Sequence, residues 1–218
     1  MKSCARFTFI SLIVFGAILG GCAKRDPVMP ILALPQTKAC AANINVGNPT
    51  PLAFDPEDAK AIDMNINEGA SCYLHPDGSK SLYGVVALPE PGYEYILTVE
   101  SYPQGSSIFS PRLLLLDANG KLLREFDRKR FMFRGAVLAG RLRVQPGERY
   151  LMVGTDAKGV GTDEQRITGM THQNTSSGVT SSGVYYAMTL NTASETVQNL
   201  TYSYGGRVKV VSQAMPSE

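Results

Sequence analysis

RLLLLDANGKLLREF, at residues 112–126, decides the fold of this chain. A run of four leucines enters the turn sequence Asp117-Ala118-Asn119-Gly120, and a second apolar run follows from Leu122. Glycine accepts the left-handed backbone that a tight turn requires, and apolar runs on both sides of such a turn pair as antiparallel strands. The stretch therefore predicts a β-hairpin with strands at 112–116 and 122–126.

Similar short strand patterns, separated by turns that contain Pro and Gly, continue on both sides of this hairpin. Residues 142–144 and 150–153 flank the turn Pro146-Gly147-Glu148 as a second predicted hairpin. Short strands with frequent turns and no long helical period are typical of a two-sheet sandwich. We expect a mainly β chain with little helix, folded over residues 51–213 as one antiparallel β-sandwich of the jelly-roll or Ig-like type. The other predicted strands are 61–66, 81–88, 93–101, 184–190 and 207–211.

One polar stretch, residues 163–182, interrupts this pattern. It is rich in Ser, Thr and Gly, and the pentapeptide TSSGV occurs at 175–179 and again at 180–184. Low-complexity polar sequence is typical of surface loops, which also carry binding residues in many proteins. We predict a loop at 163–182, either a mobile connection or a binding loop.

The N-terminus has the features of an export signal. Lys2 and Arg6 precede an apolar stretch at 7–19, which is too short to span a bilayer as a helix. Leu19-Gly20-Gly21-Cys22 resembles the bacterial lipobox. That resemblance implies removal of residues 1–21 and acylation of Cys22 by diacylglycerol and a fatty acid such as palmitate. The alternative is an ordinary signal peptide in which Cys22 is incidental.

Acylation at Cys22 predicts a location for the protein. Two or three acyl chains hold a protein stably on a membrane. Ala23 follows the cysteine, in place of the aspartate that resembles an inner-membrane retention signal. We therefore expect the protein in the periplasm, anchored to the inner leaflet of the outer membrane. Residues 22–50 contain Pro27, Pro30, Pro35 and Pro49 and are predicted to be a tether.

Export also bears on the cysteines. After removal of residues 1–21 and acylation of Cys22, the remaining thiols are Cys40 and Cys72. An oxidising compartment favours a disulfide between them, and two separate buried thiols are the alternative.

Charge is nearly balanced but unevenly distributed. The 218 residues are 44% hydrophobic and 18% charged, which excludes disorder, and the formal charge of +2 argues against a nucleic-acid partner. Residues 44–100 contain nine acidic and two basic side chains, a net of −7; residues 111–150 contain ten basic and four acidic, a net of +6. Either these charges pair across the sandwich, or a basic and aromatic patch faces an anionic glycan, lipid or acidic partner. The candidate patch is Arg128, Lys129, Arg130, Phe131, Phe133 and Arg134.

Catalytic motifs are missing from the sequence. It contains no GxSxG, HExxH, phosphate-binding loop or dinucleotide fingerprint, and no cluster of Cys and His with metal-ligand spacing. His75 and His172 stand alone in turn and loop sequence, where histidines are mostly surface residues. We expect no catalytic site, cofactor or metal.

The order of motifs resembles the maltose operon periplasmic protein family over about residues 50–160. The resemblance rests on SSIFSPRLLLLDANGKLLREF at 106–126, RFMFRG at 130–135 and RLRVQPGERYLMVGTDAK at 141–158, after PLAFDPEDAKAIDMNINEG at 51–69 and SLYGVVALPE at 81–90. It implies a periplasmic protein associated with carbohydrate uptake, and it offers no catalytic residues. We expect a non-enzymatic, lipid-anchored accessory protein that assists carbohydrate uptake through an envelope protein or glycan. The alternative is a structural or stress-related envelope lipoprotein that acts through protein contacts.

Overall fold

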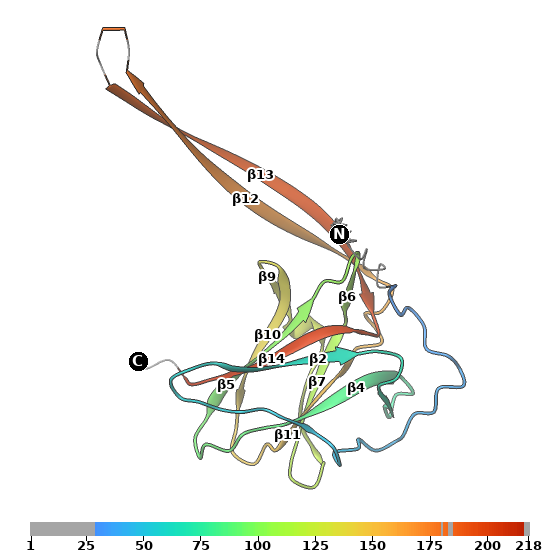
Figure 1. Cartoon of the computed structure of the whole chain (residues 1–218). Coiled ribbons are helices and arrows are strands. Elements are labelled where there is room, and N and C mark those ends of the chain that lie inside the picture. The colour runs from blue at the N-terminus through green and yellow to red at the C-terminus, as the bar shows by residue number, and fades with distance from the viewer. Residues whose placement is uncertain (1–28, 180, 183–184, 216–218) are drawn as a thin grey trace, which may run out of the picture.

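The chain forms a body of two β-sheets and a long hairpin that projects from it (Figure 1). The computed structural model describes residues 29–179, 181–182 and 185–215. Within these residues the one helical element is a single 3-10 turn, η1, at Arg128–Arg130, so the prediction of a mainly β chain is confirmed. Cys22 and the predicted signal sequence lie outside the described residues.

The first sheet has the spatial order β1-β4-β11-β7-β8, and β3 also pairs with β4. Its strands are β1 Thr50–Pro51, β3 Ser71–Leu74, β4 Lys80–Ala87, β7 Pro111–Leu116, β8 Leu122–Phe126 and β11 Tyr150–Thr155. The predicted hairpin is present, because β7 and β8 pair antiparallel. Its turn has Gly120 at φ +76°, and the Asp117 carboxylate accepts the N–H groups of Asn119 and Lys121 at 2.8 and 2.9 Å.

The second sheet has the order β2-β14-β5-β10-β9 and is antiparallel throughout. Its strands are β2 Lys60–Ile66, β5 Tyr95–Tyr102, β9 Met132–Arg134, β10 Val137–Val144 and β14 Gly206–Gln213. Alternating side chains of both sheets point inward and form one core, which confirms the two-sheet prediction. Core residues from the first sheet include Leu113, Leu115, Leu151 and Val153, and those from the second include Leu97, Val99, Val208 and Val210.

The outer face of the first sheet is also buried. Leu114 and Leu116 of β7 point away from the core and pack with Tyr83, Val85 and Met152. Ile44 and Val46, from the predicted tether, cover this second cluster. A continuous leucine run therefore makes sense in β7, because both faces of that strand lie out of water.

The predicted tether is thus wrong for its described part, residues 29–50. The Ile31 N–H donates to Ser203 Oγ at 2.8 Å, and the Tyr204 N–H donates to the Ile31 carbonyl at 2.8 Å. Ala41 forms a β-bridge with Tyr73. Apolar side chains and backbone groups of residues 29–50 are stabilised more by contacts and hydrogen bonds with the sheet than by water, so this segment lies along the body.

The second predicted hairpin is also wrong. β10 belongs to the second sheet and β11 to the first, so the turn at Pro146-Gly147-Glu148 carries the chain from one sheet to the other. Glu148 explains the crossing: it is buried, accepts the Gln145 N–H at 2.8 Å, and forms an ion pair with Arg124 at 2.6 Å. These bonds stabilise the turn between the two sheets. β10 pairs with β5 and β11 pairs with β7, so the two strands do not pair with each other.

The loop predicted at 163–182 is mostly a strand. β12, Asp163–Val179, pairs antiparallel with β13, Tyr185–Ser203, over its whole length. β13 then pairs in parallel with β6, Ser107–Phe109, over Thr201–Ser203. The Thr-rich composition that suggested a loop is equally compatible with strand pairing in the extended conformation, because threonine is β-branched. Of the described chain, no helix is long and apolar enough to cross a membrane.

Candidate functional site

The predicted basic and aromatic patch does not form one surface. This segment connects β8 of the first sheet to β10 of the second, so its aromatic rings close the edge of the core: Phe131 is buried against Gly140, and Phe133 packs on the core cluster. Arg128 is engaged at the base of the hairpin. The exposed members that lack an acidic partner within the described chain are Lys129, Arg130 and Arg134.

Arg128 fastens the base of the projecting hairpin to the body. Its guanidinium pairs with Glu164 of β12 at 2.9 Å and lies 4.5 Å from the ring centre of Tyr202 of β13. The Tyr202 hydroxyl donates to the same Glu164 carboxylate at 2.9 Å. Burial of the ring, together with this hydrogen bond, raises the pKa of Tyr202 to about 12. The hairpin therefore leaves the body from a fixed base.

The opposite charges of residues 44–100 and 111–150 pair only in part. Arg143 pairs with Glu94 at 3.0 Å, and Arg149 forms an ion pair with Glu90. Other basic residues of 111–150 pair within that segment, as Arg124 does with Glu148. Some charges of the two segments therefore pair, as the first alternative expects in part, while the combined basic and aromatic patch of the second alternative is not formed.

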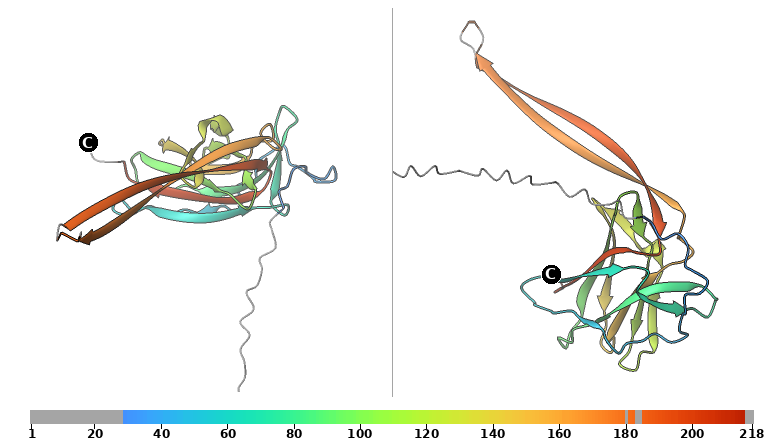
Figure 2. Two further views of the ribbon diagram at one scale, coloured as in Figure 1. Left: turned by 90° about the horizontal axis from the view of Figure 1, so that it is seen from above. Right: turned by 45° about the vertical axis from the view of Figure 1, so that its right-hand side comes forward.

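The most unusual element is the distal part of the hairpin, residues 167–179 and 185–197, which we call the arm. It extends from the body in every view (Figure 2). β6 reaches only Thr201–Ser203 of β13, so along the arm the outer edges of both strands have no strand partner among the described residues. Backbone N–H and C=O groups along such edges are free to pair with another strand.

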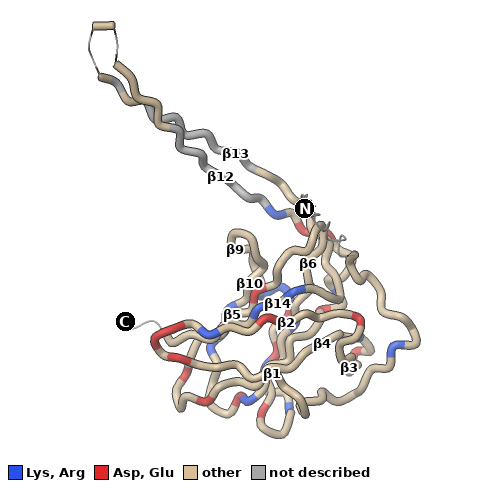
Figure 3. Tube along the Cα trace, viewed as in Figure 1, with Lys and Arg blue, Asp and Glu red and all other residues tan. Residues whose placement is uncertain are grey.

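The arm also lacks the usual protection of exposed strand edges. Residues 167–194 contain no Asp, Glu, Lys, Arg or Pro. The charged residues of the hairpin, Asp163, Glu164, Arg166 and Glu195, lie toward its base, and residues 167–194 between them carry none; Figure 3 shows acidic and basic residues at the base of the hairpin. Natural edge strands commonly carry lysine or proline, which prevents unwanted pairing. The edge of the arm therefore has no strand partner among the described residues, and over 167–194 it also lacks the charged residues and prolines that usually prevent pairing.

A second feature is a cavity of about 230 Å³ at one corner of the sandwich. It lies between residues 89–93, which precede β5, and residues 145–149, which connect β10 to β11. Pro89, Pro91 and Pro146 give it apolar walls, and Tyr93 is half exposed there. We call this the corner cavity.

Tyr95 is one of the residues that line the corner cavity. Its side chain is 1% exposed, and its Oη has no hydrogen-bond partner within the described chain. Burial, and then the nearby Glu148 carboxylate, raise the pKa of Tyr95, so the phenol keeps its proton at all physiological pH values. The hydroxyl is thus a buried donor without an acceptor among the described residues.

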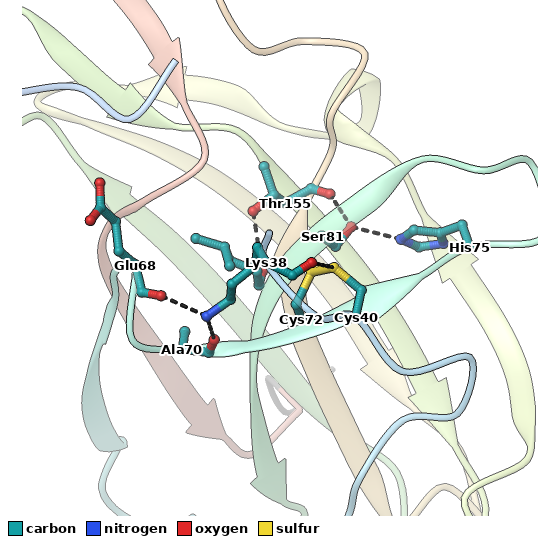
Figure 4. The surroundings of a disulfide bond; sticks show 9 residues. Lys38, Cys40, Glu68, Ala70, Cys72, His75, Ser81 and Thr155 are labelled. Atoms are coloured by element: carbon teal, nitrogen blue, oxygen red, sulfur yellow. Dashed lines mark hydrogen bonds between the residues drawn. A yellow bond between two sulfur atoms is a disulfide. The ribbon is translucent and has the colours of Figure 1, made fainter. Parts of the chain in front are cut away.

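The structure contains the Cys40–Cys72 disulfide, as predicted, with Cα atoms 4.5 Å apart (Figure 4). Beside it, Lys38 Nζ donates to the carbonyls of Glu68 and Ala70 at 2.7 and 2.9 Å. The bond fixes the N-terminal segment to β3. Its role in this setting is structural.

His75 is not on the surface, contrary to expectation. It is 5% exposed, and its Nε2 lies 2.6 Å from Ser81 Oγ (Figure 4). The Ser81 hydroxyl donates its proton to the Thr155 carbonyl at 2.5 Å, so the histidine is the donor in the His75–Ser81 bond. This serine and histidine tie β4 to β11 and are arranged as a structural network. Burial, followed by the charge of Arg112, lowers the pKa of His75.

Comparisons with protein-family models, with curated proteins and with solved structures found no match to this chain. The resemblance to the maltose operon periplasmic protein family therefore stays a prediction. Among the described residues no group of three or more His, Cys, Asp and Glu side chains is placed to hold a metal ion.

Sequence reasoning missed both the arm and the corner cavity. The arm left a signal: 28 residues without charge or proline form too long a stretch for an ordinary solvated loop, in which charged residues are common. The corner cavity left none, because its two loops meet only through the crossing between sheets at residues 145–149.

Proposed function

We propose that this protein is a non-enzymatic, lipid-anchored periplasmic accessory protein that acts by binding another envelope component through its arm. The resemblance to the maltose operon family favours carbohydrate uptake as the process it assists. The observation that carries the proposal is the arm itself: two long strands, held by a fixed base, with free edges and no charge over residues 167–194. Val179, Tyr185 and Val197 of the arm are exposed, and such an edge suits contact with a partner.

Anchoring through Cys22 would keep the base of the arm near the membrane. Ile31 is bonded to Ser203 and Tyr204, directly after the arm returns to the body. Nine residue steps separate Cys22 from Ile31, and a fully extended chain covers at most about 3.4 Å per residue. The arm base would then lie within roughly 31 Å of the acyl chains.

Site-specific photo-crosslinking in intact cells tests this function. A photoreactive residue at Ser177 samples the arm, and one at Arg141, exposed on the second sheet, is the matched control. We expect defined adducts from position 177 and few from 141. A sugar porin or binding protein in the adduct supports uptake, and a cell-wall complex supports the structural alternative. Adducts at position 141 alone would contradict a role for the arm.

Fractionation tests the anchor separately. Cys22→Ala is expected to release the protein into the soluble periplasmic fraction or to leave it unprocessed. Unchanged association of this variant with the outer membrane would contradict lipid attachment at Cys22.

The corner cavity favours a second function, the binding of a small glycan. Tyr93 is 51% exposed and offers a ring face on which a sugar can stack, while Glu90 and Arg149 supply polar groups in the same cavity. Isothermal titration with maltodextrins is the test, and Tyr93→Ala is the variant that should abolish any heat. No heat with the unmodified protein would remove glycan binding and leave the arm as the functional element.

A further inference from the structure

From the arm we infer that two copies of this chain pair with each other, strand β12 against strand β12 in antiparallel orientation. The inference rests on the proposed function, in which the arm is the contact element, and it names the partner. Three observations support it: the β12 edge has no strand partner in the described chain beyond β13, residues 167–194 carry no charge, and the contact would have two-fold symmetry.

An isolated two-stranded ribbon is marginal in water, and three or more strands are normally required for independent stability. The β12–β13 hairpin meets this condition only at its base, where β6 adds a third strand over Thr201–Ser203. Thirteen residues of β12, 167–179, continue beyond the base with one strand neighbour. At about 3.4 Å per residue they offer an edge roughly 44 Å long. A second strand on this edge would add roughly one backbone hydrogen bond per residue pair.

The composition of the arm suits pairing with a copy of the same chain. When a strand pairs antiparallel with its own copy, each residue faces another residue of the same strand, so several charges of one sign on that strand would repel one another across the contact. Residues 167–194 contain no acidic or basic side chain, so the β12 edge at 167–179 is free of this penalty.

Geometry favours the β12 edge. Antiparallel pairing of one strand with its copy has two-fold symmetry and closes at two chains. The outer edge of β13 is already occupied at its base by β6, whereas β12 has β13 as its one strand neighbour in the described chain. Because each arm projects away from its body, the two bodies would lie at opposite ends of a four-stranded ribbon and would not collide (Figure 1).

Charge variants of purified full-length protein test the inference by sedimentation velocity. The first variant carries Lys at four β12 positions spaced by three residues, so that in any antiparallel register that overlaps them like charges lie directly opposite or diagonal to one another. The second carries Glu at the same positions. We expect the unmodified protein to be dimeric, each variant alone to lose dimer affinity by at least about 100-fold, and an equimolar mixture of the two to recover it. The positions are Thr168, Thr171, Asn174 and Ser177.

A matched control places lysines on the β13 residues that face the same four positions. These are Thr196, Ala193, Leu190 and Ala187. Their lysines lie one strand farther from the β12 contact, so we expect a smaller loss of affinity. A monomeric unmodified protein, dimeric β12 variants, no recovery on mixing, or a larger effect from β13 would each overturn β12–β12 pairing.

Folding of the variants is checked with a shortened arm. Replacing residues 168–196 with Asn-Gly joins Ile167 to Val197, which are already cross-strand partners, through a two-residue hairpin turn. This variant should be monomeric and keep the melting temperature of the body. Crosslinks from Ser177 to a different envelope protein, with no dimer, would contradict self-pairing while leaving the proposed function intact. No crosslink from Ser177 at all would contradict both.

Discussion

The body and the arm use the same backbone hydrogen bonding but differ in what covers their strands. In the body, β7 is buried on both faces, by the core through Leu113 and Leu115 and by the N-terminal segment through Leu114 and Leu116. In the arm, β12 and β13 extend beyond every other strand of the described chain. The comparison indicates that the core that stabilises the fold lies in the body, and we propose that the arm is completed by a partner outside the chain. The predictions below test this division.

The largest expected effect is in the core. Leu115 is fully buried, and Leu115→Ala leaves a cavity, so the free energy of unfolding should fall by about 2 to 5 kcal/mol. Val197 of the arm is 57% exposed, and Val197→Ala should change the free energy of unfolding by less than about 0.5 kcal/mol. Urea titration measures both. Equal losses at the two positions would show that the arm contributes to the same cooperative unit.

The next effect concerns the disulfide. Cys40 and Cys72 are 32 residues apart, and replacing both with Ser removes a cross-link worth about 3 to 4 kcal/mol in the chain-entropy description. Thermal unfolding of purified protein, with and without reduction, gives the value. Reduction should have no further effect on the double variant. An unchanged melting temperature would show that residues 29–50 hold to the body without the bond.

A smaller effect follows from His75. Its pKa is lowered in the folded protein, mainly by burial, so the unfolded chain binds the proton more readily. Stability is therefore complete above pH 6.5, the ordinary histidine pKa, and falls as the pH drops from there through the lowered value. Urea titrations at pH 7.5 and 5.5 should show this loss, and His75→Asn should lose less over the same interval. Identical pH dependence of the two proteins would assign the loss to other groups.

The smallest expected effect is at Tyr95. Its buried Oη has no partner within the described chain, so Tyr95→Phe removes an unsatisfied hydroxyl and should leave the free energy of unfolding unchanged or raise it by up to about 1 kcal/mol. A loss of more than that would show that the hydroxyl is bonded in the native protein. The corner cavity would then offer no free donor to a ligand.

Much of the body could be predicted from local sequence. The hairpin at 112–126 follows from the leucine run and the Asp117–Gly120 turn, and alternation at 61–66 correctly placed Ile62, Met64 and Ile66 on the inner side of β2. The disulfide followed from cysteine count and the predicted compartment. The hairpin and the alternation depend on residues that are near in sequence, and the disulfide follows because Cys40 and Cys72 are the two thiols that remain after residues 1–22 are set aside.

The errors have a common physical origin in long-range contacts. Residues 145–149 have the turn sequence of a hairpin, but the partners that β10 and β11 choose lie far away in the chain, so the turn crosses between sheets. Prolines suggested a tether before β1 that is held only in part, by the disulfide, although Ile44 and Val46 pack against an apolar sheet face there. Ser and Thr at 163–182 suggested a loop, because composition does not reveal that residues 185–203 provide the opposite strand.

Hydrogen exchange as a function of protein concentration tests the central claim most directly. In a single copy, the amides on the outer edge of β12 at 167–179 have no strand partner and should exchange rapidly, while those of the body core exchange slowly. At high concentration the account predicts strong protection of peptide 167–179, with no change in the body and none in the four-lysine β12 variant. Exchange in peptide 167–179 that stays equally fast at every concentration would contradict the pairing of two arms.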